Sequence, residues 1–303
     1  MKRGGILLGV GFFLITISGF SQDYTFKVLA NKGANEYKSA DGWQALKTGA
    51  SLKSGDELKI SENAYLGLVH INGKPLEVKQ AGNYKVADLA AKVGTGTSVV
   101  NKYTDFILSS NSAEAKKNRL SATGAVHRGT PGQLNLLLPA DPTSAYVFGK
   151  SMVIEWTDQK IAGPYIVTLE NIFEEELIKI ETPEKMVRID LSDPKFANET
   201  ALMVVVVSKK DPAVKSGDKK VVKKISVAEG ERIKKSFAEI AGDVKDESAF
   251  SKFIQAGFFE QNKLLIDALT SYDDAIRLAP DVEDFKIGKE EFLIRNNMVP
   301  VKK

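Results

Sequence analysis

Residues 65–78 read Tyr-Leu-Gly-Leu-Val-His-Ile-Asn-Gly-Lys-Pro-Leu-Glu-Val and give the clearest fold signal in the chain. The apolar run is broken by Asn72-Gly73, a dipeptide whose tolerance of positive φ angles suits a two-residue hairpin turn. The pattern therefore predicts two antiparallel strands joined at this turn. Such a hairpin is typical of a small β-barrel or sandwich.

The preceding sequence continues this β pattern. Apolar residues at alternate positions indicate a strand over residues 24–30. Short turns at Gly49 and Gly55 then separate further apolar positions, which we expect to be buried in the same domain. These positions are Trp43, Leu46, Leu52, Leu58 and Ile60.

Specific spacings in this region point to a known family. They are Trp43-x2-Leu46-x2-Gly49-x2-Leu52-x2-Gly55-Asp56-x-Leu58, then Asn63-Ala64-Tyr65-Leu66, then the Asn72-Gly73 turn. Residues 24–90 thereby resemble the periplasmic β-domain of the FecR family. In that family the domain belongs to membrane-spanning regulators that pass a signal from an outer-membrane receptor to a sigma factor. Because this sequence lacks both the sigma-binding segment and the internal membrane helix, the resemblance implies an interaction module without the signalling role.

The first 22 residues have the character of an export signal. Lys2 and Arg3 precede an apolar run from Ile6 to Phe20, which is short for a bilayer span, and small residues follow as a cleavage site. We expect cleavage after Ser21, with an uncleaved anchor as the alternative. The absence of cysteine excludes a lipid-anchored form of the signal. The expected location is the periplasm, or a secreted or cell-envelope location in a Gram-negative bacterium.

Composition narrows the class of protein. Removing the signal leaves 40 basic residues against 39 acidic ones, a balance that argues against a nucleic-acid partner. An exported chain with no cysteine has neither disulfides nor thiolate metal sites, so its stability must come from its cores.

The middle of the chain predicts a seven-stranded β-sandwich over 134–228. Strands are expected over 134–138, 152–156, 165–170, 177–181, 186–190, 201–208 and 220–227. The segment Ser151-Met-Val-Ile-Glu-Trp156, followed after Gly163-Pro164 by Tyr165-Ile-Val, resembles immunoglobulin and fibronectin type III domains. That resemblance implies that Trp156 anchors the core.

Helical periodicity marks the rest of the chain. Helices are predicted over 86–93, 99–112, 229–244 and 285–298, and a polar inter-domain linker over 111–133. Residues 249–282 resemble a single tetratricopeptide repeat. The resemblance is carried by Ala256, Phe259, Ala268, Tyr272, Ala275 and Pro280.

The predicted organisation is a signal peptide (1–21), a FecR-like β-domain (22–93), a helical and polar linker (94–133), a β-sandwich (134–228) and a helical tetratricopeptide-like region (229–303). The fold class is thus multi-domain, mainly β in its first two domains and all-α at its C-terminal end.

Residues for catalysis or metal binding are scarce. The two histidines, His70 and His127, have no second ligand at metal-binding spacing and are read as structural or solvated. The acidic cluster 174–176 is read as a solvated turn, and Asp190, Asp193 and Glu199 do not form a calcium loop. We therefore predict no catalytic residue, no metal site and no cofactor. The basic stretch 209–224 keeps open a peripheral contact with anionic lipid or polysaccharide.

Two functions remain open at this stage. The favoured one is a non-enzymatic binding or assembly protein of the cell envelope that acts through contacts with other envelope proteins. The alternative is a carbohydrate-active enzyme or sugar-binding accessory protein, which would need an exposed aromatic ring near carboxylates. For the first function we predict a partner-binding groove between 249–257 and 264–278, with contacts from Lys252, Phe258 and Lys263.

Overall fold

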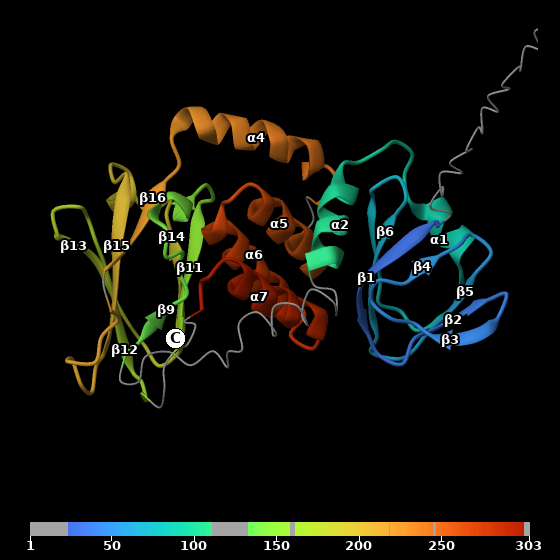
Figure 1. Cartoon of the computed structure of the whole chain (residues 1–303), viewed down its shortest axis with the longest axis horizontal. Helices are drawn as coiled ribbons and strands as arrows, with labels where there is room; N and C mark the ends of the chain where they lie inside the picture. The colour runs from blue at the N-terminus through green and yellow to red at the C-terminus, as the bar shows by residue number, and fades with distance from the viewer. Residues whose placement is uncertain (1–23, 111–132, 158–160, 218, 245–246, 300–303) are drawn as a thin grey trace, which may run out of the picture.

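The computed structural model describes residues 24–110, 133–157, 161–217, 219–244 and 247–299. Figure 1 shows three regions in a row, with the C-terminal helices between two β-sheet regions. The predicted signal peptide, His127 and most of the predicted linker lie outside the described residues. The described ranges contain no helix with the length and apolar character needed to span a bilayer.

The N-terminal region forms two four-stranded sheets around one apolar core. The strand orders are β4-β1-β6-β7 and β3-β2-β5-β8. The strands are β1 (Phe26–Lys32), β2 (Glu36–Ser39), β3 (Gly42–Ala45), β4 (Ser51–Leu52), β5 (Glu57–Ile60), β6 (Tyr65–His70), β7 (Pro75–Val78) and β8 (Gly82–Lys85). The predicted hairpin is confirmed as β6 and β7, with Gly73 at a φ of +91° in the turn.

One predicted core position in this region is wrong. Trp43 keeps 46% of its surface exposed, whereas Leu46, Leu52, Leu58 and Ile60 are buried as expected. Strand β3 is at the edge of its sheet, and Trp43 pairs with Lys38 on the face of the sheet opposite the core. The glycine-and-apolar spacing did not identify which face this edge residue occupies.

The middle region consists of two sheets that enclose a second core. The orders are β14-β11-β9 and β10-β16-β15-β12-β13. The strands are β9 (Asn135–Leu136), β10 (Tyr146–Val147), β11 (Ser151–Thr157), β12 (Tyr165–Glu170), β13 (Glu176–Thr182), β14 (Met186–Asp190), β15 (Ala201–Ser208) and β16 (Lys220–Lys224). All seven strands expected in this range are present, and the two-residue β10 was not predicted. Two 3-10 turns, Pro142–Ser144 and Pro194–Phe196, complete the region.

Trp156 is fully buried in this second core, as predicted. Its ring meets the ring of Tyr165 edge to face, with 5.2 Å between the centroids. The contact joins β11 in one sheet to β12 in the other, so it fixes the two sheets face to face.

Helices occupy the ranges expected from periodicity. Among the described residues, two short helices follow the first β region and four follow the second. They are α1 (Val86–Lys92), α2 (Val100–Ser110), α4 (Val227–Ala241), α5 (Ala249–Gln261), α6 (Leu265–Leu278) and α7 (Glu283–Arg295). The protein is therefore β-rich in its N-terminal and middle parts and helical at its C-terminal end.

The third core explains why the helices lie between the sheets. It combines residues of α2 and α4–α7 with Leu29, Ala30, Tyr65 and Val69 from β1 and β6. The sheet that contains β1 and β6 therefore has apolar side chains on both faces. One face packs on the core of the N-terminal region, and the other packs on the helices. In Figure 1, α4 crosses above α5 and connects the middle sheets to the side where α2 lies.

Candidate functional site

The three residues predicted to bind a partner do not share a surface. Lys252 on α5 is mostly buried and pairs with Glu247 at 2.6 Å. Lys263 is exposed in the turn between α5 and α6 at a φ of +61°. Phe258 is fully buried, which rules out its predicted role as an exposed contact.

Phe258 is buried because helices outside the hairpin cover it. Its ring packs edge to face on Tyr103 of α2 and Phe237 of α4, at centroid distances of 5.3 and 5.2 Å. Helix α2 approaches closely at Gly257, where a Cβ would lie 2.8 Å from Cδ1 of Ile107 and would push that side chain aside. The hairpin face nearest α2 is thus used inside the protein.

Hydrogen bonds and ion pairs between distant parts of the sequence instead lie where the helices meet the two β-sheet regions. We call the contact of α5–α7 with the first region the N-terminal joint, and the contact of α6–α7 with the second region the middle joint. Both joints use side chains that are far apart in sequence.

The N-terminal joint combines close packing with two carboxylates. The ring of Phe250 lies on Gly67 of β6, where a Cβ would be 2.6 Å from the ring. Glu77 accepts hydrogen bonds from the Phe250 backbone N–H at 3.1 Å and from the Tyr65 hydroxyl at 2.9 Å. Asp284 of α7 accepts from the Asn31 backbone N–H at 2.8 Å.

Their environments shift the pKa values of these two carboxyls in opposite directions. Burial raises the pKa of Glu77, but hydrogen bonds from Lys79, Ser248 and Tyr65 bring it below its ordinary value. Burial raises the pKa of Asp284 above its ordinary value, although it accepts two hydrogen bonds. The contribution of Glu77 to stability is therefore lost as pH falls, and that of Asp284 is lost as pH rises.

The middle joint begins with Asp267 of α6. Its two carboxylate oxygens accept the backbone N–H groups of Phe148 and Gly149, at 2.9 and 2.6 Å. Burial raises the pKa of Asp267 to about 7, because desolvation of the charged form outweighs the two N–H donors. One turn later Thr270 accepts the backbone N–H of Val153 at 3.0 Å.

A charged cluster continues the middle joint along α7. Lys289 lies between Glu155 of β11, at 2.5 Å, and Asp273 of α6, at 2.6 Å. Burial raises the pKa of Asp273 to about 6 despite the opposing effect of Lys289. Burial alone would lower the pKa of Lys289, but the two carboxylates raise it above its ordinary value. At the edge of the cluster, Arg188 of β14 pairs with Asp274 at 2.7 Å.

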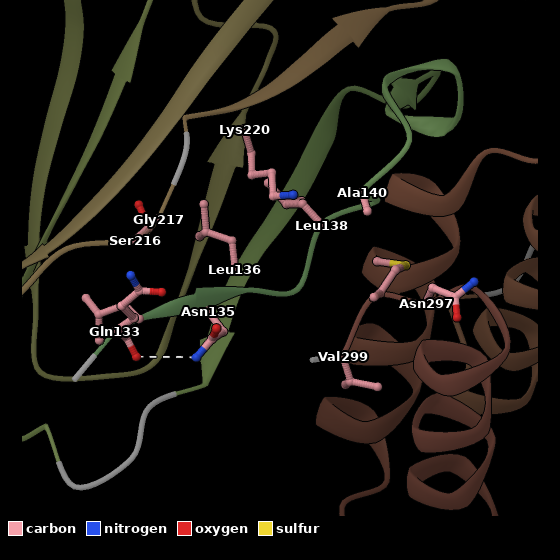
Figure 2. Close-up of a pocket in the computed structure, with 12 residues that line it drawn as sticks. Gln133, Asn135, Leu136, Leu138, Ala140, Ser216, Gly217, Lys220, Asn297 and Val299 are labelled. Atoms are coloured by element: carbon pink, nitrogen blue, oxygen red, sulfur yellow. Dashed lines mark hydrogen bonds between the residues drawn. The ribbon is translucent and has the colours of Figure 1, made fainter. Parts of the chain in front are cut away.

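A hollow of about 340 Å³ lies next to this joint, between the middle sheets and the residues after α7 (Figure 2). This is near the small end of the range for ligand pockets. Leucines of the β9 segment and residues 298–299 provide its apolar lining, and the polar side chains around it are Gln133, Asn135, Ser216, Lys220 and Asn297. The polar groups are amides, a hydroxyl and one amine.

Other residues considered from the sequence have local structural contacts. His70 packs edge to face on Phe26 at 5.0 Å, and its Nδ1 accepts the Asn72 backbone N–H. Asp190 and Asp193 accept backbone N–H groups within their own turns. Among the residues described, no group of three or more histidine or acidic side chains has an arrangement that could hold a metal ion.

Comparison with known proteins adds no relative. No protein-family model matches the chain, and no curated protein matches it in sequence. The joints themselves were missed by sequence reasoning. The sequence held two signals of them: Asp267 is an acidic residue inside the apolar run Leu264-Leu-Ile-Asp-Ala-Leu269, and residues 65–69 are a continuous apolar run.

Proposed function

We propose that this chain is an exported, non-enzymatic binding or assembly protein of the Gram-negative cell envelope that acts through contacts with other envelope proteins. The observation that carries the proposal is the pair of joints, which hold two β-sheet regions on opposite sides of one helical unit. A rigid separation of two β modules is the property that a scaffold needs to hold partners at a fixed spacing. The export signal predicted in the first 22 residues supports the location.

The identities of the modules are part of this proposal. The order β14-β11-β9 facing β10-β16-β15-β12-β13, with a buried tryptophan in contact with a tyrosine of the opposite sheet, supports an immunoglobulin or fibronectin type III-like sandwich. The hairpin of α5 and α6, with Ala256, Ala268 and Ala275 buried, supports a single tetratricopeptide-like repeat. The paired four-stranded sheets support the FecR-like module. These are analogies of fold, and they carry no specific partner.

The function is tested by recovering partners of the tagged chain from envelope extracts after brief cross-linking. We expect defined envelope proteins to be enriched over a tag-only control, and to be lost when Asp267→Ala weakens the middle joint. Enrichment that does not change in this variant would contradict the role of fixed spacing. No enrichment at all would contradict the assembly role.

The location has a separate test. Intact-mass analysis of the envelope fraction should find a chain that begins at Gln22. A chain that retains residues 1–21 would identify the segment as an anchor.

The sugar-binding alternative gains one specific observation. Trp43 is exposed on β3. On the same face of the sheet, Lys38 of β2 is its cross-strand partner, and Glu57 of β5 is the next residue in register. This alternative needs an exposed ring beside two carboxylates, and Glu57 supplies one carboxylate on this face. Retardation by cell-wall polysaccharide in affinity electrophoresis, lost in Trp43→Ala and retained in Ile71→Ala, would favour this alternative. Ile71 serves as the control because it has the same exposed fraction, 46%.

A further inference from the structure

The hairpin turn between β12 and β13 exposes two large apolar side chains. Ile172 keeps 57% of its surface exposed, and Phe173 keeps 76%. Turns usually consist of polar residues, and exposure of two adjacent large apolar groups has no benefit for the folded monomer. We call residues 171–175 the tip.

The tip is held in one conformation. Asn171 is buried, and its Oδ1 accepts the backbone N–H groups of Phe173 and Glu175, at 2.9 and 3.1 Å. Its Nδ2 donates to the Glu175 carboxylate at 2.7 Å. Lys219 pairs with Glu174 at 3.2 Å from the neighbouring loop. A pre-ordered apolar tip loses little conformational entropy when it binds.

A groove with apolar side chains at its base and charged side chains around them lies close to the tip on the same region. It opens between the edge strands β13 and β14, where the two middle sheets separate, and has a volume of about 530 Å³. Ile178 and Ile180 of β13 are on the core side of their sheet but are only partly buried, because nothing among the described residues closes this side. Phe196 and Ile189 line the groove from the opposite side.

We propose that this chain self-associates by placing the apolar tip of one copy in the groove of a second copy. The tip directly precedes β13, and β13 forms one wall of the groove. A two-fold axis between two such surfaces makes both contacts at once, the arrangement of most protein dimers. Each copy then covers the exposed Phe173 and the partly open core of the other.

Charge favours this occupant. The tip contains Glu174 and Glu175, and Glu176 follows it directly. These acidic side chains disfavour insertion of the tip into an anionic membrane. Three acidic and three basic side chains line the groove, and two of the basic ones, Lys179 and Lys195, contact acidic neighbours at 3.5 and 3.7 Å. These are long ion pairs on exposed side chains, so both lysines are available to the glutamates of a second tip.

Sedimentation velocity on the purified chain tests the contact without any envelope partner, so its outcome is independent of the proposed function. We expect a monomer–dimer equilibrium that shifts over about a hundred-fold range of concentration. Phe173→Ser should weaken dimerisation at least about tenfold, since each 1.4 kcal/mol changes a dissociation constant by that factor. Val227→Ser is the matched control, because Val227 is 86% exposed on α4 and should leave the equilibrium unchanged.

Cross-linking then locates the contact. Because the chain contains no cysteine, introduced thiols are the only ones present. A mixture of Glu174→Cys and Lys195→Cys should give the mixed dimer with a short bis-maleimide, whereas Glu174→Cys with Val227→Cys should give little. A chain that stays monomeric at all concentrations, or a dimer that Phe173→Ser does not weaken, would overturn the proposal and assign the tip to a different molecule.

Discussion

The two joints hold the same helical unit but use different chemistry. The N-terminal joint is mainly apolar, with Phe250 against Gly67 and Tyr65 against Phe285 at a centroid distance of 5.6 Å. The middle joint is mainly polar, and its carboxyls at Asp267 and Asp273 both have raised pKa values. Apolar packing is insensitive to pH and salt, whereas buried ionisable groups couple stability to protonation. We therefore expect the middle joint to be the one that responds to conditions.

The largest effect should come from the apolar joint. Phe250→Ala removes a buried ring and leaves a cavity against β6, so we expect the free energy of unfolding to fall by about 3–5 kcal/mol. Denaturant unfolding followed by circular dichroism measures this loss. Val227→Ala is the control, because its side chain is 86% exposed on α4 and a surface truncation changes stability by only about 0.5 kcal/mol. Equal losses in both variants would contradict the packing described for this joint.

The second effect tests the charged cluster of the middle joint. Lys289→Met leaves Glu155 and Asp273 without their shared cation, and we expect a loss of about 2–4 kcal/mol near neutral pH, since breaking buried ion pairs is costly. The loss should shrink in acid, where Asp273, whose pKa is raised to about 6, becomes protonated. Lys286→Met, on the same helix but exposed and paired with Glu283 at 3.5 Å, is the control. A small, pH-independent effect of Lys289→Met would show that the cluster is solvated.

The two joints also differ in how far sequence could predict them. The apolar character of the first was readable, because residues 65–69 of β6 are continuously apolar, as in a strand covered on both faces. The sequence could not predict which residues cover the face of β6 that points to the helices, because Phe250, which packs on Gly67 there, lies far along the chain. In the middle joint, Lys289 and Glu155 are separated by 134 positions, and a lone lysine on a helix gives no sign of such a partner.

Strand positions in the middle region were predicted well because turn residues and alternation mark each one. Strands β12, β14 and β15 have the predicted bounds. The two failures have one cause. Trp43 and Phe258 were assigned from local patterns, but their burial depends on whether a distant element covers them. Within the part of the chain that the structure describes, no distant element buries Trp43, which stays 46% exposed on its edge strand, whereas α2 and α4 both cover Phe258.

The third prediction concerns pH. The pKa of Asp267 is about 7 in the folded protein, against 3.8 for an ordinary aspartate, so the folded state binds this proton more tightly. The resulting stability is fully present below about pH 4 and is lost as pH rises through 7. Relative to Asp267→Asn, which does not titrate, the free energy of unfolding should fall by on the order of a few kcal/mol across this window.

Unfolding curves at several pH values test this prediction, with Asp281→Asn as an exposed control. Asp281 is 76% exposed, so its replacement should leave the pH profile unchanged. A wild-type profile parallel to that of Asp267→Asn would mean that Asp267 stays ionised in the folded protein. The stability of the middle joint would then not depend on the protonation of Asp267.

The smallest effect should come from Arg188 at the edge of the middle joint. Arg188→Gln removes an ion pair whose cation is 36% exposed, and exposed pairs contribute only about 0–1 kcal/mol. Asp274 also keeps a second cation, Arg277 at 3.1 Å, so its charge stays compensated. The small difference between wild type and variant should vanish in high salt, where exposed charges are screened, whereas the cost of Lys289→Met should persist. A large, salt-resistant loss in Arg188→Gln would move the boundary of the buried cluster outward to β14. The buried charged cluster would then include side chains from two strands of this sheet, β11 and β14, and not from β11 alone.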